Sequence, residues 1–206
     1  MSVSACALFA GCGSGGGSGA GTATSVVRQA ADATAKASGF TFRLPSVEVT
    51  YNAPDRVEQI EHGQASTAAS GNGSPAASIG PAPATITKII VGDRYYEANA
   101  GDGQARSFTV SQRCPRDNAA DVVLEVLRAI AFDGQAEGSD GRYTFTLPAA
   151  ASTSAITGTV IVDGGYVRQL SVASGTFAPA VTIEAIGAAP TVAAPLSASL
   201  GNTSCG

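Results

Sequence analysis

The chain of 206 residues has few charged side chains, a single histidine and no long apolar run. Charged residues make up 14% of the sequence, and 12 Lys and Arg against 16 Asp and Glu give a net charge of −4. The basic residues do not gather in any cluster, so we expect no nucleic-acid partner, because binding to phosphates needs concentrated positive charge. Every apolar run is shorter than the roughly 18 residues of a membrane-spanning helix, which predicts that the chain does not cross a membrane.

The single histidine, His62, restricts the chemistry that the chain can perform. A zinc site built on several histidines is excluded, and a Ser-His-Asp triad would have to use His62 although no serine lies in a G-x-S-x-G turn. The acidic residues stand apart, mostly at turns, so paired-carboxylate catalysis has no support. We therefore expect a binding protein that is not an enzyme and that holds no metal and no cofactor, with His62 exposed at a strand end.

The sequence does contain many short apolar pieces that alternate with polar residues and are separated by turns. Residues 86–91 are mostly β-branched, Gly92-Asp93 is a typical hairpin turn, and an aromatic pair follows, which predicts a hairpin over Thr85–Asn99. Apolar residues take even-numbered positions at Phe40, Phe42 and Leu44 and odd-numbered positions at Val47, Val49 and Tyr51. Because the two sets differ in parity, a bulge or kink is expected between them, at Pro45-Ser46. Further strands are expected near residues 56–64, 107–111, 135–138, 142–147, 158–162, 166–172 and 180–186.

Two helices interrupt these strands. One is expected between a Ser25 N-cap and a Gly39 C-cap, with a narrow face of small residues that suits a lid or cover. The other is expected over Ala119–Phe132, capped by Asp117 or Asn118. This order predicts an α+β domain at residues 25–206, in which the low-complexity residues 64–83 form a flexible insert.

The N-terminal residues 1–24 form a separate segment. An apolar run and two small residues precede a cysteine in Ala7-Leu8-Phe9-Ala10-Gly11-Cys12, and a Gly/Ser-rich stretch follows. This resembles the lipobox of bacterial lipoproteins, and the resemblance implies cleavage before Cys12 and lipidation of Cys12, with a Gly/Ser tether after it. The segment is shorter than a full secretory signal, so we expect the natural start to lie upstream of Met1. The alternative is a disordered Gly/Ser terminus with an incidental cysteine.

Several short motifs follow the first helix in a fixed order: Gly39-Phe40-Thr41-Phe42, Ala53-Pro54-Asp55-Arg56-Val57, Ile90-Val91-Gly92-Asp93-Arg94-Tyr95-Tyr96, the second helix, Gly138-Ser139-Asp140-Gly141-Arg142-Tyr143-Thr144-Phe145, Val162-Asp163-Gly164-Gly165 and Ala194-Pro195. By this order the chain, from Ser25 to Pro195, resembles the LolA-like and LppX/LprG-like families of bacterial lipoprotein and lipid carriers. The resemblance implies a curved antiparallel half-barrel of roughly nine to eleven strands, with helices that cover its concave face and a cavity for acyl chains.

Nine apolar and aromatic residues are candidates for the cavity lining. An apolar residue on a sheet face shows only that something covers it, so these residues line a cavity or form an ordinary core. They are Phe40, Phe42, Tyr95, Phe108, Leu127, Ile130, Tyr143, Phe145 and Leu147.

Two cysteines, Cys114 and Cys205, remain once Cys6 leaves with the leader and Cys12 is acylated. Export allows them to form a disulfide that ties the C-terminal tail to the residues before the second helix. The alternative is two unrelated thiols.

These expectations combine into a lipoprotein anchored on the extracytoplasmic face of the cell membrane, which binds or transports a lipid or an acyl chain. Shielding acyl chains from water supplies the driving force, so no catalysis is needed. The alternative is a non-catalytic sensing or scaffold module of the same fold that contacts another envelope protein.

Overall fold

A computed structural model describes residues 19–63, 85–100, 107–113, 118–149, 155–173 and 180–201. Cys6, Cys12, Cys114 and Cys205, together with the predicted insert at 64–83, lie outside these residues. The described elements are α1 (Gly19–Ala35), β1 (Gly39–Leu44), β2 (Val47–Asn52), β3 (Arg56–His62), β4 (Thr85–Val91), β5 (Arg94–Ala100), β6 (Thr109–Gln112), α2 (Ala119–Asp133), β7 (Gln135–Ser139), β8 (Arg142–Leu147), β9 (Ile156–Asp163), β10 (Tyr166–Val172), β11 (Val181–Glu184) and β12 (Ser199–Leu200).

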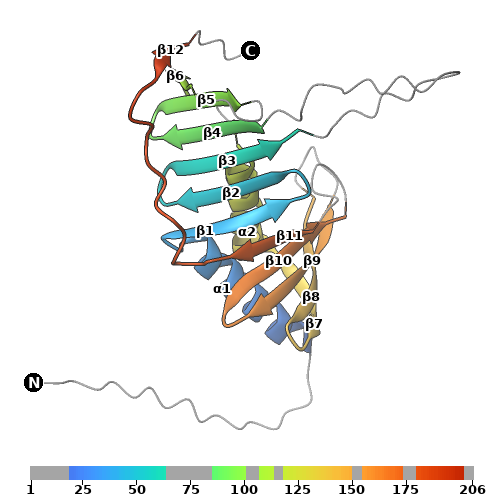
Figure 1. Cartoon of the computed structure of the whole chain (residues 1–206). Helices are drawn as coiled ribbons and strands as arrows, with labels where there is room; N and C mark the ends of the chain where they lie inside the picture. The colour runs from blue at the N-terminus through green and yellow to red at the C-terminus, as the bar shows by residue number, and fades with distance from the viewer. Residues whose placement is uncertain are drawn as a thin grey trace, which may run out of the picture.

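All the described strands belong to one open sheet (Figure 1). The sheet has 12 strands in the order β12-β6-β5-β4-β3-β2-β1-β11-β10-β9-β8-β7. Neighbouring strands are antiparallel except β12, which runs parallel to β6. The predicted α+β class and the mostly antiparallel sheet are therefore confirmed, and the bent, unclosed sheet is consistent with a curved half-barrel.

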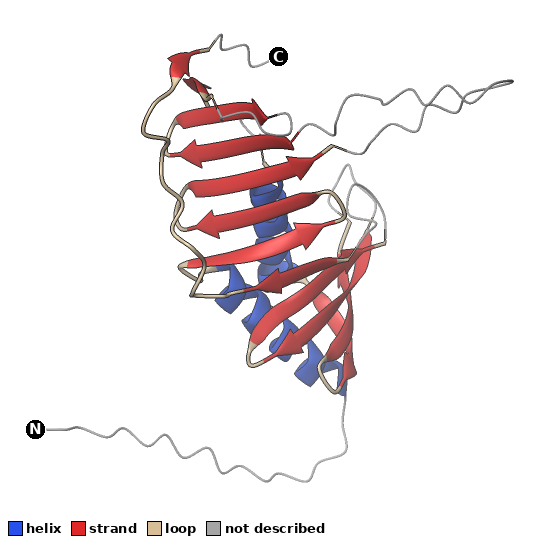
Figure 2. Cartoon of the chain, in the orientation of Figure 1, coloured by secondary structure: helices blue, strands red, loops and turns tan. Residues whose placement is uncertain are grey.

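Both helices lie on the same side of the sheet (Figure 2). We call this side the helix-covered face; it carries Phe40 and Phe42 of β1, Tyr51 of β2 and Phe145 of β8, all of them buried. Helix α1 packs mainly against α2, β7 and β10, and α2 reaches β8 and β2. The helices thus cover the part of the sheet from β2 through β1 and β11 to β7, and this interface holds the main hydrophobic core.

The hairpin of β4 and β5 forms as the sequence predicts. Gly92 has a φ of +63° in the turn, a conformation that suits glycine, and Asp93 completes the turn. Strand pairing then runs from Val91 opposite Arg94 to Thr85 opposite Ala100.

The expected bulge at Pro45-Ser46 is wrong. These two residues form a turn that joins β1 to β2, and the two strands pair with Leu44 opposite Val47. The residue numbers of two residues that lie opposite each other across such a turn differ by an odd number. Residues on one face of the sheet therefore have even numbers before the turn and odd numbers after it. The change of parity therefore marks two antiparallel strands and not one kinked strand.

The first helix is displaced from its expected bounds. It begins at Gly19, within the predicted tether, and ends at Ala35, while Gly39 opens β1. Contacts with the sheet explain the early start, since Ala23 is buried and the Thr24 hydroxyl bonds to Ala136 of β7.

Residues 185–201, which we call the C-terminal strap, cross the outer face of the sheet. Val192 of the strap is 2% exposed and packs against Ile89 and Tyr96. The Asn52 side chain donates to Pro190 O at 3.0 Å and accepts from Val192 N at 2.6 Å. The strap ends in β12, a strand that the sequence did not reveal.

Candidate functional site

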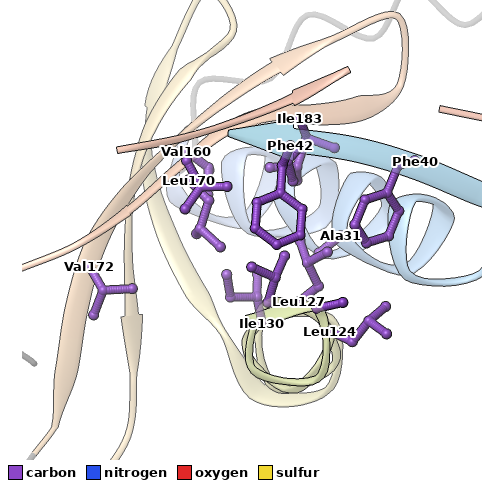
Figure 3. Packing of buried hydrophobic residues seen from close by; sticks show 14 of the residues in the cluster. Ala31, Phe40, Phe42, Leu124, Leu127, Ile130, Val160, Leu170, Val172 and Ile183 are labelled. Atoms are coloured by element: carbon purple, nitrogen blue, oxygen red, sulfur yellow. The ribbon is translucent and has the colours of Figure 1, made fainter. Parts of the chain in front are cut away.

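The space between the helices and the sheet is filled by side chains (Figure 3). Six of the nine predicted cavity residues lie in this core and are between 0 and 8% exposed: Phe40, Phe42, Leu127, Ile130, Phe145 and Leu147. Figure 3 shows Phe42 pointing from β1 toward Leu127 and Ile130 of α2. In this conformation these residues pack against one another as a core.

The remaining three candidates lie elsewhere. Tyr95 and Tyr143 are partly buried at the margin of the same core. Phe108 instead packs against the second cluster, made by Ile89, Tyr96 and Val192, and so lies apart from the other candidates. It shares the outer face of the sheet with Val110, which lies opposite Tyr96.

Helix α1 covers the sheet with small side chains. Its buried residues are Ala23, Val27, Ala30, Ala31 and Thr34. The helix packs on α2 and on strands β7 and β10, which contribute Ala136, Val167 and Leu170 to the same core. The helix therefore closes the space by lying close to the sheet, and it contributes little apolar volume of its own.

Three polar side chains fasten α1 to the backbone of the sheet and of the α2 C-cap. The Thr24 hydroxyl accepts from Ala136 N at 2.9 Å, and Arg28 Nε donates to Gly134 O at 2.7 Å. The hydroxyl of Thr34, which is fully buried, donates to Ala30 O and accepts from Val167 N at 2.9 Å. Val167 lies where the register of β9 and β10 shifts, so Thr34 satisfies an amide at the irregularity.

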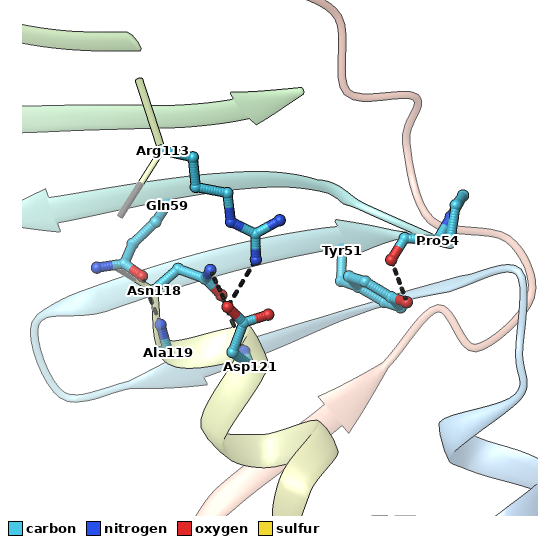
Figure 4. A network of polar contacts seen from close by, with 7 residues as sticks. All are labelled: Tyr51, Pro54, Gln59, Arg113, Asn118, Ala119 and Asp121. Atoms are coloured by element: carbon cyan, nitrogen blue, oxygen red, sulfur yellow. Dashed lines mark hydrogen bonds and ion pairs between the residues drawn. The ribbon is translucent and has the colours of Figure 1, made fainter. Parts of the chain in front are cut away.

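The start of α2 is held by a polar network that the sequence predicted in part (Figure 4). Asn118 is the N-cap, and its side chain accepts from Asp121 N at 2.9 Å. Arg113 pairs with the Asp121 carboxylate at 2.7 Å, and the Gln59 side chain accepts from Ala119 N at 3.0 Å. The network ties α2 to β3 and to the end of β6.

Beyond α2 the helix-covered face becomes polar across β3, β4 and β5. Lys88 Nζ lies 2.6 Å from Glu61 Oε1, and Gln59 donates to the same oxygen at 2.6 Å. Glu97 lies opposite Lys88 in the register of β5 and β4, and its carboxylate accepts from the Tyr95 hydroxyl at 2.5 Å. Sequence analysis missed this group, although the alternation within β3 and β4 places these residues on one face.

Surface hollows lie outside the core. The largest of three, about 440 Å³, is formed by α1, β7 and β8, and small and polar residues line it: Gly21, Thr24, Gln135, Ala136, Glu137, Thr144 and Thr146. Two others, of about 380 and 350 Å³, lie beside β12 and between the two helices. None of the nine predicted cavity residues lines these three hollows.

Titratable groups give no sign of a catalytic centre in the described ranges. His62 is exposed at the end of β3, as expected. Burial raises the pKa of Tyr51, with a smaller opposing effect from Arg128, and its hydroxyl donates to Pro54 O. Among the described residues, no three His, Cys, Asp or Glu side chains group as metal ligands would.

No protein-family model and no curated protein sequence matches the chain. Neither α1 nor α2, the helices in the described part of the chain, combines the length and the hydropathy that a membrane-spanning helix needs.

Proposed function

We propose that this chain is a membrane-anchored extracytoplasmic lipoprotein that binds the acyl chain of a lipid or lipoprotein without catalysis. In this proposal the open sheet is the half-barrel, Cys12 carries the anchor, and the acyl chain takes the place of α1 on the helix-covered face. The observation that carries the proposal is the small-residue face of α1, which lies in the same core as Phe40, Phe42 and their neighbours.

The energies favour such an exchange for an acyl chain that comes from water. Burial of one valine and three alanines stabilises the docked α1 by about 4–5 kcal/mol, at roughly 0.8 kcal/mol per methyl or methylene group. The bonds of Thr24, Arg28 and Thr34 add about 1 kcal/mol each. An acyl chain of roughly 15 methylenes gains about 12 kcal/mol on leaving water, which exceeds the cost of displacing α1.

The same comparison gives the transfer a direction. An acyl chain that leaves for a bilayer stays in an apolar environment, so its own free energy changes little. When the acyl chain leaves, α1 docks on the sheet again, and the free energy of this docking favours release of the acyl chain. The chain would load dispersed acyl groups and unload them spontaneously at a membrane.

Binding of a dispersed fatty acid tests the proposal. The Cys12→Ser chain carries no anchor of its own, and we expect it to bind a fluorescent long-chain fatty acid at one site per chain. Added phosphatidylcholine vesicles should then remove the probe. Lipid extraction and mass spectrometry of the purified chain provide an independent measurement. Failure to bind any acyl probe, together with no co-purified lipid, would contradict the proposal.

A second candidate is a ligand-free sensing or scaffold module of the cell envelope. The complete burial of Phe40, Phe42, Leu127 and Phe145 favours it, because the helices already fill the interior. This candidate predicts no acyl binding under any condition, so the same titration separates the two functions.

A further inference from the structure

An aromatic side chain lies fully in solvent on the helical layer. Phe132 of α2 is 86% exposed, whereas every other apolar residue of this helix is buried or partly buried. It shares the outward stripe of α2 with Glu125 and Arg128, three and four residues apart along the helix. It also borders the hollow of about 350 Å³ between the helices, with Asp32, Ala35, Lys36, Arg128 and Ala131. We call these six residues the Phe132 patch.

The charges at the patch are nearly balanced. Lys36 pairs with Asp32 at 2.8 Å, and beside the patch Arg28 lies 3.9 Å from Asp133. Arg128 has no ion pair within the part of the chain that the structure describes. An exposed aromatic ring with one spare cation suits the interface of a bilayer, where rings lie at headgroup level, and needs no anionic lipid.

The length of chain before α1 favours a bilayer over other occupants. Residues 13–18 separate Cys12 from Gly19, and at about 3.5 Å per residue this stretch spans about 25 Å at most. Helix α1 leads from Gly19 to Lys36 of the patch in 17 steps of about 1.5 Å each, so the helical layer can lie along the membrane. A surface held so near the bilayer needs only weak affinity, because the tether supplies a high effective concentration.

We propose that the Phe132 patch docks on the lipid bilayer to which Cys12 tethers the chain, with the Phe132 ring at headgroup depth. Docking turns the helical layer toward the membrane and leaves the outer face and the strap toward the aqueous side. This inference rests on the anchor of the proposed function and is independent of acyl binding.

A tryptophan at position 132 reports the contact directly, because the sequence contains no other tryptophan. The Phe132→Trp chain, with Cys6, Cys114 and Cys205 changed to Ser, is coupled through Cys12 to a maleimide lipid in phosphatidylcholine vesicles. We expect its emission to shift to shorter wavelength and to be quenched by brominated lipid. Because the patch carries only one spare cation, Arg128, added salt should change the shift little.

The matched control is Leu196→Trp, since Leu196 is 108% exposed and lies on the strap. Its emission should remain that of a solvated indole on the same vesicles. An unchanged emission at position 132, or an equal shift at position 196, would overturn the proposal. A shift that needs no vesicles and grows with protein concentration would mean that a second copy covers the patch, and would overturn it too.

The design separates this proposal from the proposed function. The chemical coupling replaces any natural acylation of Cys12, and fatty-acid titration of the uncoupled chain measures carriage by itself. If the serine variant unfolds, the Trp chain with all native cysteines is held on nickel-chelating lipid through an N-terminal histidine tag, with the same expected and contrary results.

Discussion

The two helices cover one sheet face by different means. Helix α2 inserts Val123, Leu124, Leu127 and Ile130 into the core, so its removal would leave large apolar side chains without partners. Helix α1 brings small residues and is fastened by bonds from its side chains to the backbone of β7, of β10 and of the α2 C-cap. Helix α2 therefore supplies the large side chains of the core, and α1 is the cover that the proposed function exchanges for an acyl chain.

The largest effect should come from truncation in α2. Leu127 is fully buried, so Leu127→Ala should lower the free energy of unfolding by about 2–5 kcal/mol through lost burial and a cavity. Chemical denaturation measures the change. Phe132→Ala, on the exposed side of the same helix, is the control and should change stability by less than about 0.5 kcal/mol. Equal effects would show that α2 is not the core helix.

A smaller effect is expected at the bond that fastens α1 near its C-terminal end. Thr34→Val keeps the shape and removes the hydroxyl, which leaves Val167 N without its partner and should lower stability by about 1–3 kcal/mol. Thr34→Ser should retain most of the stability, and the exposed Thr159→Val should be neutral. Of these three variants, only Thr34→Val should accelerate hydrogen exchange at the Val167 amide. If this amide stays protected in Thr34→Val, the bond from Val167 N to Thr34 does not stabilise the docked helix.

Loss of the α2 cap should cost less. Asn118→Ala removes the acceptor for Asp121 N and should lower the free energy of unfolding by about 1 kcal/mol, as for other N-caps. Asn118→Ser retains a capping oxygen and should recover most of that loss. Denaturation midpoints of the two variants test this, and a neutral Asn118→Ala would mean that Arg113 and Gln59 hold the helix start by themselves.

The smallest effect concerns alkaline pH. Burial raises the pKa of Tyr51 above its ordinary value of 10.0, so the folded state holds this proton more tightly than the unfolded state. The resulting stability is complete below the unfolded pKa and is lost as pH rises through the folded pKa. Tyr51→Phe should therefore flatten the decline of stability above pH 10. If stability declines equally in the natural protein and in Tyr51→Phe, titratable groups other than Tyr51 cause the decline.

Sequence reasoning located the elements that depend on local signals. The hairpin at Gly92-Asp93 and the helix that begins at Ala119 follow from turn and cap residues, and both are present. The extension of α1 to Gly19 depends on Ala136, more than a hundred residues away, and β12 has only two residues and depends on β6. Local patterns hold no information on such partners.

The candidate site was predictable only as a set of buried residues. Alternation placed Phe40, Phe42 and Phe145 on the covered face, but it could not tell whether a helix or a ligand covers them. Phe108 has the parity of Val110, which lies opposite Tyr96 on the outer face, and this placement depends on the register of β5 and β6. The same alternation predicts that Glu61 and Lys88 lie on one face of the sheet, once the register of β3 and β4 is known.

The central claim is that α1 is a displaceable cover, and acyl affinity in a loosened variant tests it most directly. A dispersed fluorescent fatty acid is titrated into the Cys12→Ser chain with and without Thr34→Val, with Thr159→Val as the control. Because Thr34→Val weakens the docked state by about 1 kcal/mol or more, it should bind the probe about fivefold more tightly or better, although it is the less stable protein. Equal or weaker binding by Thr34→Val would contradict the account.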